Sequence, residues 1–193
     1  MNDQTWFNLL ALAAAIAVLV FGGLAMAISA APTPAPAATL AAPGIDYLYL
    51  TIEFNPSTGL DEYFPGNFSV PAHQLVVITI TNFDNGTNVP PASADRVQGT
   101  VGASAFEQAT AATSSRSYTQ LPSSAISHTF SVLQTPYGLN VPIPPAVSLD
   151  VPVVVSFSTY FNQTGTFAWM CQAPCDPGSM TTPGLMTGTL EVV

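Results

Sequence analysis

Residues 170–179 read MCQAPCDPGS and contain both cysteines of the chain, Cys171 and Cys175. The segment lies between two stretches of strand-forming residues near the C-terminus, and a loop fixed at both ends by strands is a good scaffold for a binding site. Met180 and Met186 follow it closely. Thiolate and thioether groups are soft ligands that favour copper. The spacing therefore predicts a copper site in this loop.

The nearest imidazole candidate is His128, in the sequence Ser-His-Thr-Phe-Ser-Val at residues 127–132. Its alternation of polar and apolar residues is typical of a strand. The chain has one other histidine, His73, which directly precedes an alternating apolar stretch. We interpret His73 as an exposed turn residue and His128 as the candidate ligand.

The charge balance excludes one class of partner. The chain has 193 residues, a formal net charge of −9, and only two basic side chains, Arg96 and Arg116. Binding to nucleic acid requires a basic face, which these residues cannot build. The charged fraction of 7% is also far below the usual quarter of residues.

Residues 6–28 form an uncharged apolar stretch. As a helix it would be roughly 34 Å long, enough to cross a bilayer core of about 30 Å. A cleaved signal peptide is the alternative, but a basic n-region is missing and the apolar run is longer than usual. We predict a transmembrane anchor at 1–29, a Pro- and Ala-rich linker at 30–44, and a single-pass protein of the cell membrane whose C-terminal domain is extracytoplasmic. The positive-inside rule gives no orientation, because no Lys or Arg flanks the stretch.

The remaining residues, 45–193, predict an all-β domain, a Greek-key β-sandwich or barrel, because short alternating stretches are separated by Pro-rich turns. The expected strands cover 45–54, 75–82, 126–133, 139–143, 151–157, 166–170 and 187–193. Residues 83–124 have weak periodicity and predict a long surface excursion with one short helix around 103–112. Three N-glycosylation motifs, at Asn67, Asn85 and Asn162, fit an outward-facing glycoprotein domain.

Three pieces in order carry a resemblance to a known family. They are Val-Pro-Ala-x-Gln-x-Val leading to Thr-Asn at 70–82, His-x-Phe-x-Val at 128–132, and the Cys-x3-Cys loop before a final strand. Together they resemble the cupredoxin fold and, more narrowly, subunit II of haem–copper terminal oxidases. That family carries a two-copper CuA centre, which accepts electrons from a soluble donor. The resemblance covers about 66–82 and 126–193.

The resemblance implies a ligand set at named positions. Cys171 and Cys175 match the bridging thiolates, His128 the first imidazole, and Ala173 the position of a weak carbonyl ligand. The match then fails, because Ser179 stands where the family has its second histidine. Thr182 likewise replaces the first methionine, and Met186 resembles that methionine displaced by a longer loop. Met180 offers another thioether. Trp169, before the loop, is either a core residue or an aromatic group that passes electrons on.

These departures leave three states of the site open. A modified copper centre uses both cysteines, His128 and either Met180 or Met186. Alternatively the site is empty, with the thiols free or joined in a disulfide. A single-copper site with one cysteine, as in blue-copper proteins, is the third state, and sulfocyanin-like membrane cupredoxins are the comparison for it.

We expect a subunit II-like part of a respiratory cytochrome or quinol oxidase, acting as an electron-entry or structural cap domain. It would be non-catalytic itself and would partner a multi-spanning haem-bearing subunit and a soluble donor or quinol. The alternative is a stand-alone, membrane-anchored blue-copper electron carrier. The sequence has no paired-carboxylate, nucleophile-elbow or phosphate-loop motif of an enzyme.

Overall fold

The computed structural model describes residues 44–109 and 115–193. The predicted anchor and nearly all of the predicted linker lie outside these residues. Among the described residues, no helix is long and apolar enough to span a membrane. The membrane anchor therefore stays a prediction.

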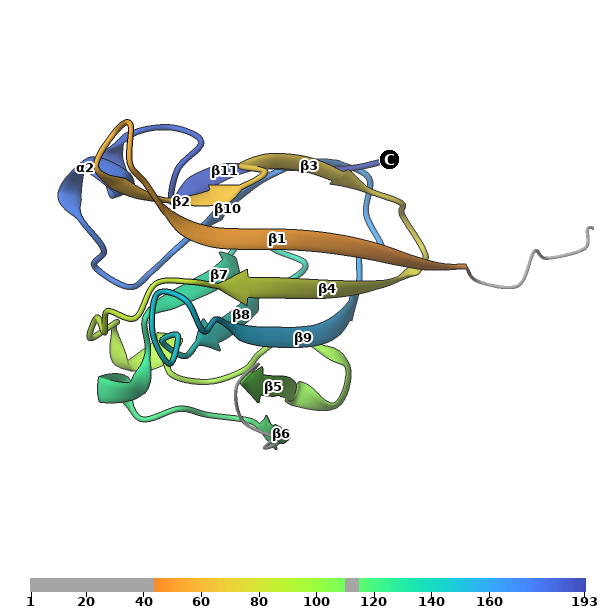
Figure 1. Ribbon diagram of the computed structural model, residues 1–193. Helices are drawn as coiled ribbons and strands as arrows, with labels where there is room; N and C mark the ends of the chain where they lie inside the picture. Colours follow the sequence, from red (N-terminus) through yellow and green to blue (C-terminus); the bar gives the residue numbers. More distant parts are fainter. Residues whose placement is uncertain (1–43, 110–114) are drawn as a thin grey trace, which may run out of the picture. The chain divides into compact units, whose positions relative to one another are not determined.

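The described chain forms two β-sheets (Figure 1). The first sheet has six strands in the order β2-β1-β4-β9-β5-β6. β1 is parallel to β4, and every other pair in this sheet is antiparallel. The strands are β1 (Ile45–Asn55), β2 (Leu60–Phe64), β4 (Leu75–Asn82), β5 (Ala105–Ala109), β6 (Ser115–Tyr118) and β9 (Val153–Tyr160).

The second sheet has five strands in the order β3-β11-β10-β7-β8. Here β11 is parallel to β3 and the other pairs are antiparallel. The strands are β3 (Asn67–Val70), β7 (His128–Val132), β8 (Leu139–Ile143), β10 (Gly165–Met170) and β11 (Thr187–Val192). One short helix, α2 (Pro177–Thr181), lies between β10 and β11 and is capped by the Asp176 side chain.

The core lies between the sheets, and strict alternation along the strands creates it. Every second residue of β4 and β9 is buried, including Ile78, Ile80 and Val155 at 0% exposure. β-branched side chains pack well on a pleated, half-buried surface, which explains their use here. The predicted all-β sandwich is confirmed, with two mixed sheets.

The excursion after β4 departs from the sequence-based expectation in two ways. The helix expected around 103–112 is wrong, because 105–109 form β5, which pairs with β9 and β6. Pairing at the open edge of β9 outweighs the weak helical pattern. The first part of the excursion also packs on the domain, since the Asn140 side chain in β8 donates to the carbonyls of Ala94 and Arg96. This contact covers part of β8, whose five residues are all buried.

Candidate metal centre

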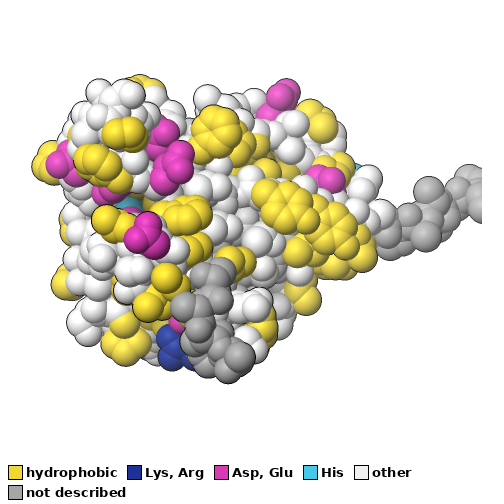
Figure 2. Space-filling view, in the orientation of Figure 1, with side chains coloured by type: hydrophobic (Ala, Val, Ile, Leu, Met, Phe, Trp, Pro, Cys, Tyr) yellow, Lys and Arg dark blue, Asp and Glu magenta, His cyan; other side chains and the backbone are white. Residues whose placement is uncertain are grey.

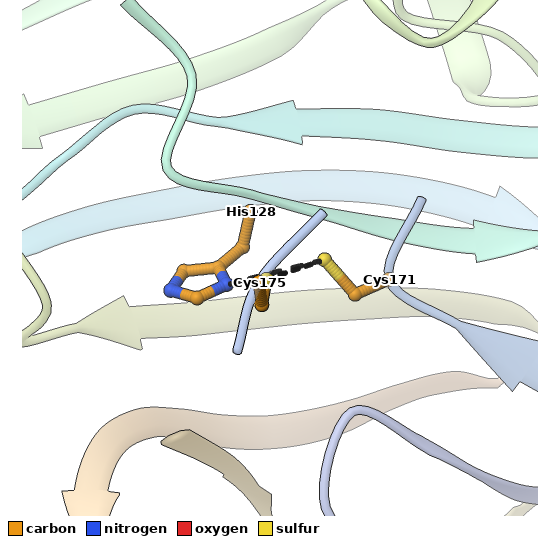
Figure 3. Close-up of side chains that lie close together, drawn as sticks. All are labelled: His128, Cys171 and Cys175. Atoms are coloured by element: carbon orange, nitrogen blue, oxygen red, sulfur yellow. Dashed lines mark hydrogen bonds between the residues drawn. The ribbon is translucent and has the colours of Figure 1, made fainter. Parts of the chain in front are cut away.

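The structure brings His128, Cys171 and Cys175 together (Figure 3). His128 begins β7, Cys171 directly follows β10, and Cys175 lies in the loop before α2. The two sulfur atoms are 3.4 Å apart and are not bonded to each other. His128 Nδ1 lies 3.0 Å from Cys175 Sγ and 3.9 Å from Cys171 Sγ. Three donor atoms from separate parts of the chain thus converge on one point.

Backbone contacts hold Cys171 firmly. Its N–H donates to the carbonyl of Met186 at 2.8 Å, which joins the start of the loop to its end. Its sulfur accepts a hydrogen bond from the Thr129 N–H at 3.3 Å. Both His128 and Cys171 have 0% exposure, and Cys175 has 6%. The ligands are therefore buried, and Cys171 is held by hydrogen bonds from both sides.

Asp84, in the turn after β4, orients the imidazole. His128 Nε2 lies 2.9 Å from Asp84 Oδ2, and the same oxygen accepts a hydrogen bond from Ser127 Oγ at 2.8 Å. The other carboxylate oxygen accepts from the Gly86 N–H at 3.0 Å. In the neutral imidazole, a carboxylate that accepts the Nε2 proton leaves Nδ1 as the atom that can bind a metal. The Nδ1 atom is the one that faces the sulfurs.

The electrostatics favour a charged site. Burial alone would lower the pKa of His128, but the hydrogen bond with Asp84 and the nearby Cys171 raise it to about 9. The hydrogen bond from His128 lowers the pKa of Asp84 to about 2, despite its partial burial. Burial would raise the pKa of Cys171, yet hydrogen bonds from Cys175 and His128 bring it well below its ordinary value. The pKa of Cys175 is raised, chiefly because it shares a hydrogen bond with Cys171. The directions of these shifts favour a charged Cys171 sulfur beside a charged imidazole.

The donor separations fit a single metal ion. Metal–sulfur bonds of about 2.3 Å and metal–nitrogen bonds of about 2.0 Å limit two sulfurs on one ion to about 4.6 Å, and a sulfur and a nitrogen to about 4.3 Å. The observed separations of 3.4, 3.0 and 3.9 Å all fall below these limits. Two thiolates and an imidazole are soft and borderline donors, which suit copper.

The other predicted ligands differ in burial and in their backbone contacts with the centre. Met186 has 0% exposure and is tied to Cys171 by its carbonyl, whereas Met180 in α2 is only half-buried. The Ala173 carbonyl lies 3.6 Å from Cys171 Sγ and accepts the Cys175 N–H at 2.8 Å. Ser179 is fully buried, and its hydroxyl has no hydrogen-bond partner among the described residues.

Trp169 is a core residue of the second sheet. It has 0% exposure, and its indole N–H donates to the Gly66 carbonyl at 2.8 Å. The ring of Tyr63 lies 4.9 Å from the Trp169 ring and 6.4 Å from the His128 ring. The ring of Tyr63 therefore lies near both the Trp169 ring and the His128 ring. A role for Trp169 in electron transfer stays a prediction.

The three sequon asparagines, Asn67, Asn85 and Asn162, are all exposed, as a modification site requires. Their glycosylation remains untested. The exposed His73 has a positive φ of 59° between β3 and β4, which agrees with its interpretation as a turn residue.

Asp84 is the residue of the site that sequence reasoning missed. It stands just after a strand and before Asn85-Gly86, which we interpreted only as a turn. Its hydrogen bond to the Gly86 N–H belongs to that turn. The bond to His128, by contrast, spans 44 positions of sequence, and no local pattern could show it.

No protein-family model matches the chain, and no curated protein matches it. Among solved structures, reduced rusticyanin is 16% identical, with 79% of this chain and 82% of that chain covered and a TM-score of 0.41. Rusticyanin from Thiobacillus ferrooxidans is 13% identical, with 77% and 78% covered and a TM-score of 0.38. Auracyanin A, a blue copper protein from the green thermophilic photosynthetic bacterium Chloroflexus aurantiacus, is 14% identical, with 78% and 100% covered and a TM-score of 0.38. Likeness at this level establishes neither the family nor the function of this chain.

Proposed function

We propose that residues 45–193 form a cupredoxin-like electron-transfer domain that holds one copper ion through His128, Cys171, Cys175 and Met186. The observation that carries the proposal is the convergence of His128 Nδ1 and the two sulfurs within 3.0–3.9 Å in a buried site. Copper would supply one-electron redox chemistry there. Soft sulfur ligands favour its reduced form, while imidazole suits both forms.

The chain's own residues prepare the site for electron transfer. Asp84 and Ser127 fix the imidazole, and the amide of Thr129 fixes one sulfur. Because Ser127 and Thr129 are fully buried and Asp84 is partly buried, we expect the ligands to move little when the charge of the centre changes. A small rearrangement of preorganised groups is what rapid electron exchange requires.

The number of histidine ligands near the sulfurs favours a site with one copper ion over a site with two. A two-copper CuA centre takes one imidazole on each ion, whereas His128 is the only histidine near the sulfurs in the described part of the chain. Ser179 is a poor copper ligand, because its hydroxyl stays protonated. This supports a single-copper carrier domain as the main proposal.

A subunit II-like role in a haem–copper terminal oxidase is the second candidate. Two sulfurs 3.4 Å apart are close enough to bridge a pair of ions, and the sequence motifs resemble that family. In that case the chain should co-purify from membranes with a multi-spanning, haem-bearing subunit. Its isolation without haem would refute the second candidate and leave the carrier.

Membrane attachment through residues 6–28 is part of the proposal and stands on the apolar sequence alone. We expect the chain to remain with membranes after washing with high salt and carbonate. Release into the supernatant would contradict attachment without bearing on copper binding.

Copper titration of the purified chain tests the ligand assignment. The wild type should bind one copper, and His128→Asn should weaken binding tenfold or more. His73→Asn is the matched control, because it removes the other imidazole from an exposed turn where asparagine tolerates the positive φ. Cys171→Ser and Cys175→Ser should each behave like His128→Asn. Unchanged binding by His128→Asn would refute the proposal.

A further inference from the structure

The outward face of the first sheet carries a neutral aromatic surface. In β1, Ile45, Tyr47 and Tyr49 point outward with exposures of 56%, 57% and 67%. Tyr160 in β9 and Phe106 in β5 are 45% and 43% exposed. Figure 2 looks onto this sheet and shows hydrophobic side chains gathered near the start of the described chain.

The register of the strands shows that these residues form one surface. Because paired residues of neighbouring strands point to the same side of a sheet, each pairing defines a row. The four rows are Ile45-Leu75-Tyr160, Tyr47-Val77-Ser158, Tyr49-Thr79-Ser156-Phe106-Ser117 and Phe64-Thr51-Thr81-Val154-Gln108-Ser115. We call these residues the neutral face. None of them is charged, although the chain as a whole has a net charge of −9.

Among the described residues of β1, charge on this side of the sheet begins at the other end of the strand. Glu53 is the next outward residue, and it pairs directly with Glu62 in β2. Asp84, beside the metal centre, lies together with Glu53 on the lining of one surface pocket. The sheet is therefore polarised along its strands, with aromatic rings at one end and carboxylates near the metal centre at the other.

The neutral face begins where the undescribed part of the chain joins the domain. Ile45, in its first row, follows the Pro- and Ala-rich residues 30–43, which in turn follow the apolar stretch 6–28. Fourteen residues in an extended polyproline-type conformation reach at most about 43 Å, so a membrane anchor in 6–28 would keep this end of the domain close to the bilayer.

We propose that the neutral face docks on the lipid–water interface of the membrane. Tyrosine rings are enriched at this interface because the ring is apolar and the hydroxyl stays hydrated. The carboxylate end, with the metal centre, would then lie away from the lipid and open to an aqueous donor. The proposal rests on the membrane attachment proposed above, but it does not depend on copper. With no basic residue on the face, binding should not require anionic lipid.

Hydroxyl-radical footprinting of the full chain in phosphatidylcholine nanodiscs tests this. Phe54 is the internal control, because it is 57% exposed, as Tyr47 is, but lies outside the neutral face. The oxidation rates of Tyr47 and Tyr49 in nanodiscs should be at most roughly one third of their rates in detergent. The oxidation rate of Phe54 should be the same in both. Adding phosphatidylglycerol should not increase the protection. The double variant Tyr47→Ser, Tyr49→Ser should return Tyr160 to its rate in detergent.

Each other outcome overturns the proposal for a distinct reason. If Tyr47 shows no more protection from oxidation in nanodiscs than Phe54 does, the domain is held away from the membrane by its linker. Protection in detergent that grows with protein concentration would assign the face to a second copy of the chain. If the chain does not elute with the nanodiscs, the membrane attachment fails, and this inference fails with it.

Discussion

Removing the Asp84 carboxylate is the sharpest perturbation of the proposed centre. Asp84→Ala takes away the acceptor of the His128 Nε2–H and of the Ser127 hydroxyl, and His128 and Ser127 both have 0% exposure. Leaving a buried donor unpaired costs about 1–3 kcal/mol, so the free energy of unfolding of the metal-free protein should fall by about 2–4 kcal/mol. Asp84→Asn keeps an acceptor oxygen and should cost about 1 kcal/mol.

The same change should weaken copper binding, because Asp84 fixes the tautomer that presents Nδ1. Loss of such a partner typically reduces metal affinity about 10–100-fold. Urea unfolding, competition with a copper chelator and nitrogen-15 spectra of the His128 ring measure the three effects separately. Glu191→Ala, which removes an exposed carboxylate in β11, is the control. Asp84→Ala with wild-type stability, affinity and tautomer would refute this reasoning.

The dependence of the free energy of unfolding on pH in the acid range independently checks the hydrogen bond between Asp84 and His128. The hydrogen bond from His128 depresses the pKa of Asp84 from 3.8 to about 2 in the folded protein. The stabilisation that it contributes is therefore fully present above about pH 4 and is lost as the pH falls towards 2. The difference in unfolding free energy between the metal-free wild type and Asp84→Asn should shrink over this range, and a constant difference would contradict the assignment.

Three further substitutions have defined outcomes. Met186→Leu should change the visible spectrum and the reduction potential of the copper-loaded protein, and it should lower the free energy of unfolding by less than about 1.5 kcal/mol. Met180→Leu should leave the spectrum and the potential unchanged. The reverse result would assign the thioether ligand to Met180. Ser179→Ala should raise the free energy of unfolding by about 1 kcal/mol, because the buried Ser179 hydroxyl is unpaired. Ser127→Ala should lower the free energy of unfolding, and urea unfolding of the two variants measures both effects. Gly188→Ala should lower the free energy of unfolding by about 2 kcal/mol or more. The new Cβ would lie 2.5 Å from the indole nitrogen of Trp169 and collide with the Gly66 carbonyl. Wild-type stability of this variant would contradict that packing.

The regular strands could be predicted because their side chains alternate. β4 and β9 bury every second residue, and that period is visible in the sequence. β5 could not be predicted from local pattern, because it is extended through pairing with β6 and with β9, and β9 is distant in sequence. The mistaken helix arose from this non-local pairing.

The residues of the candidate metal centre also fall into those that local sequence could predict and those that it could not. The Cys-x3-Cys spacing and the position of His128 within a predicted strand pointed to the three residues that the structure brings together. Asp84 was missed because a carboxylate before Asn-Gly is an ordinary turn, and its role depends on a contact between the ends of β4 and β7. The position of Met186 beside Cys171 likewise depends on a hydrogen bond across the loop.

The electron-spin-resonance spectrum of the copper-loaded chain, with its copper content, tests the central claim most directly. The account predicts one copper per chain, a hyperfine pattern from a single copper nucleus, and reversible loss of the signal on one-electron reduction. Failure to retain copper while both thiols remain titratable would contradict it. So would two coppers that share one unpaired electron, and this result would support the oxidase-type centre instead.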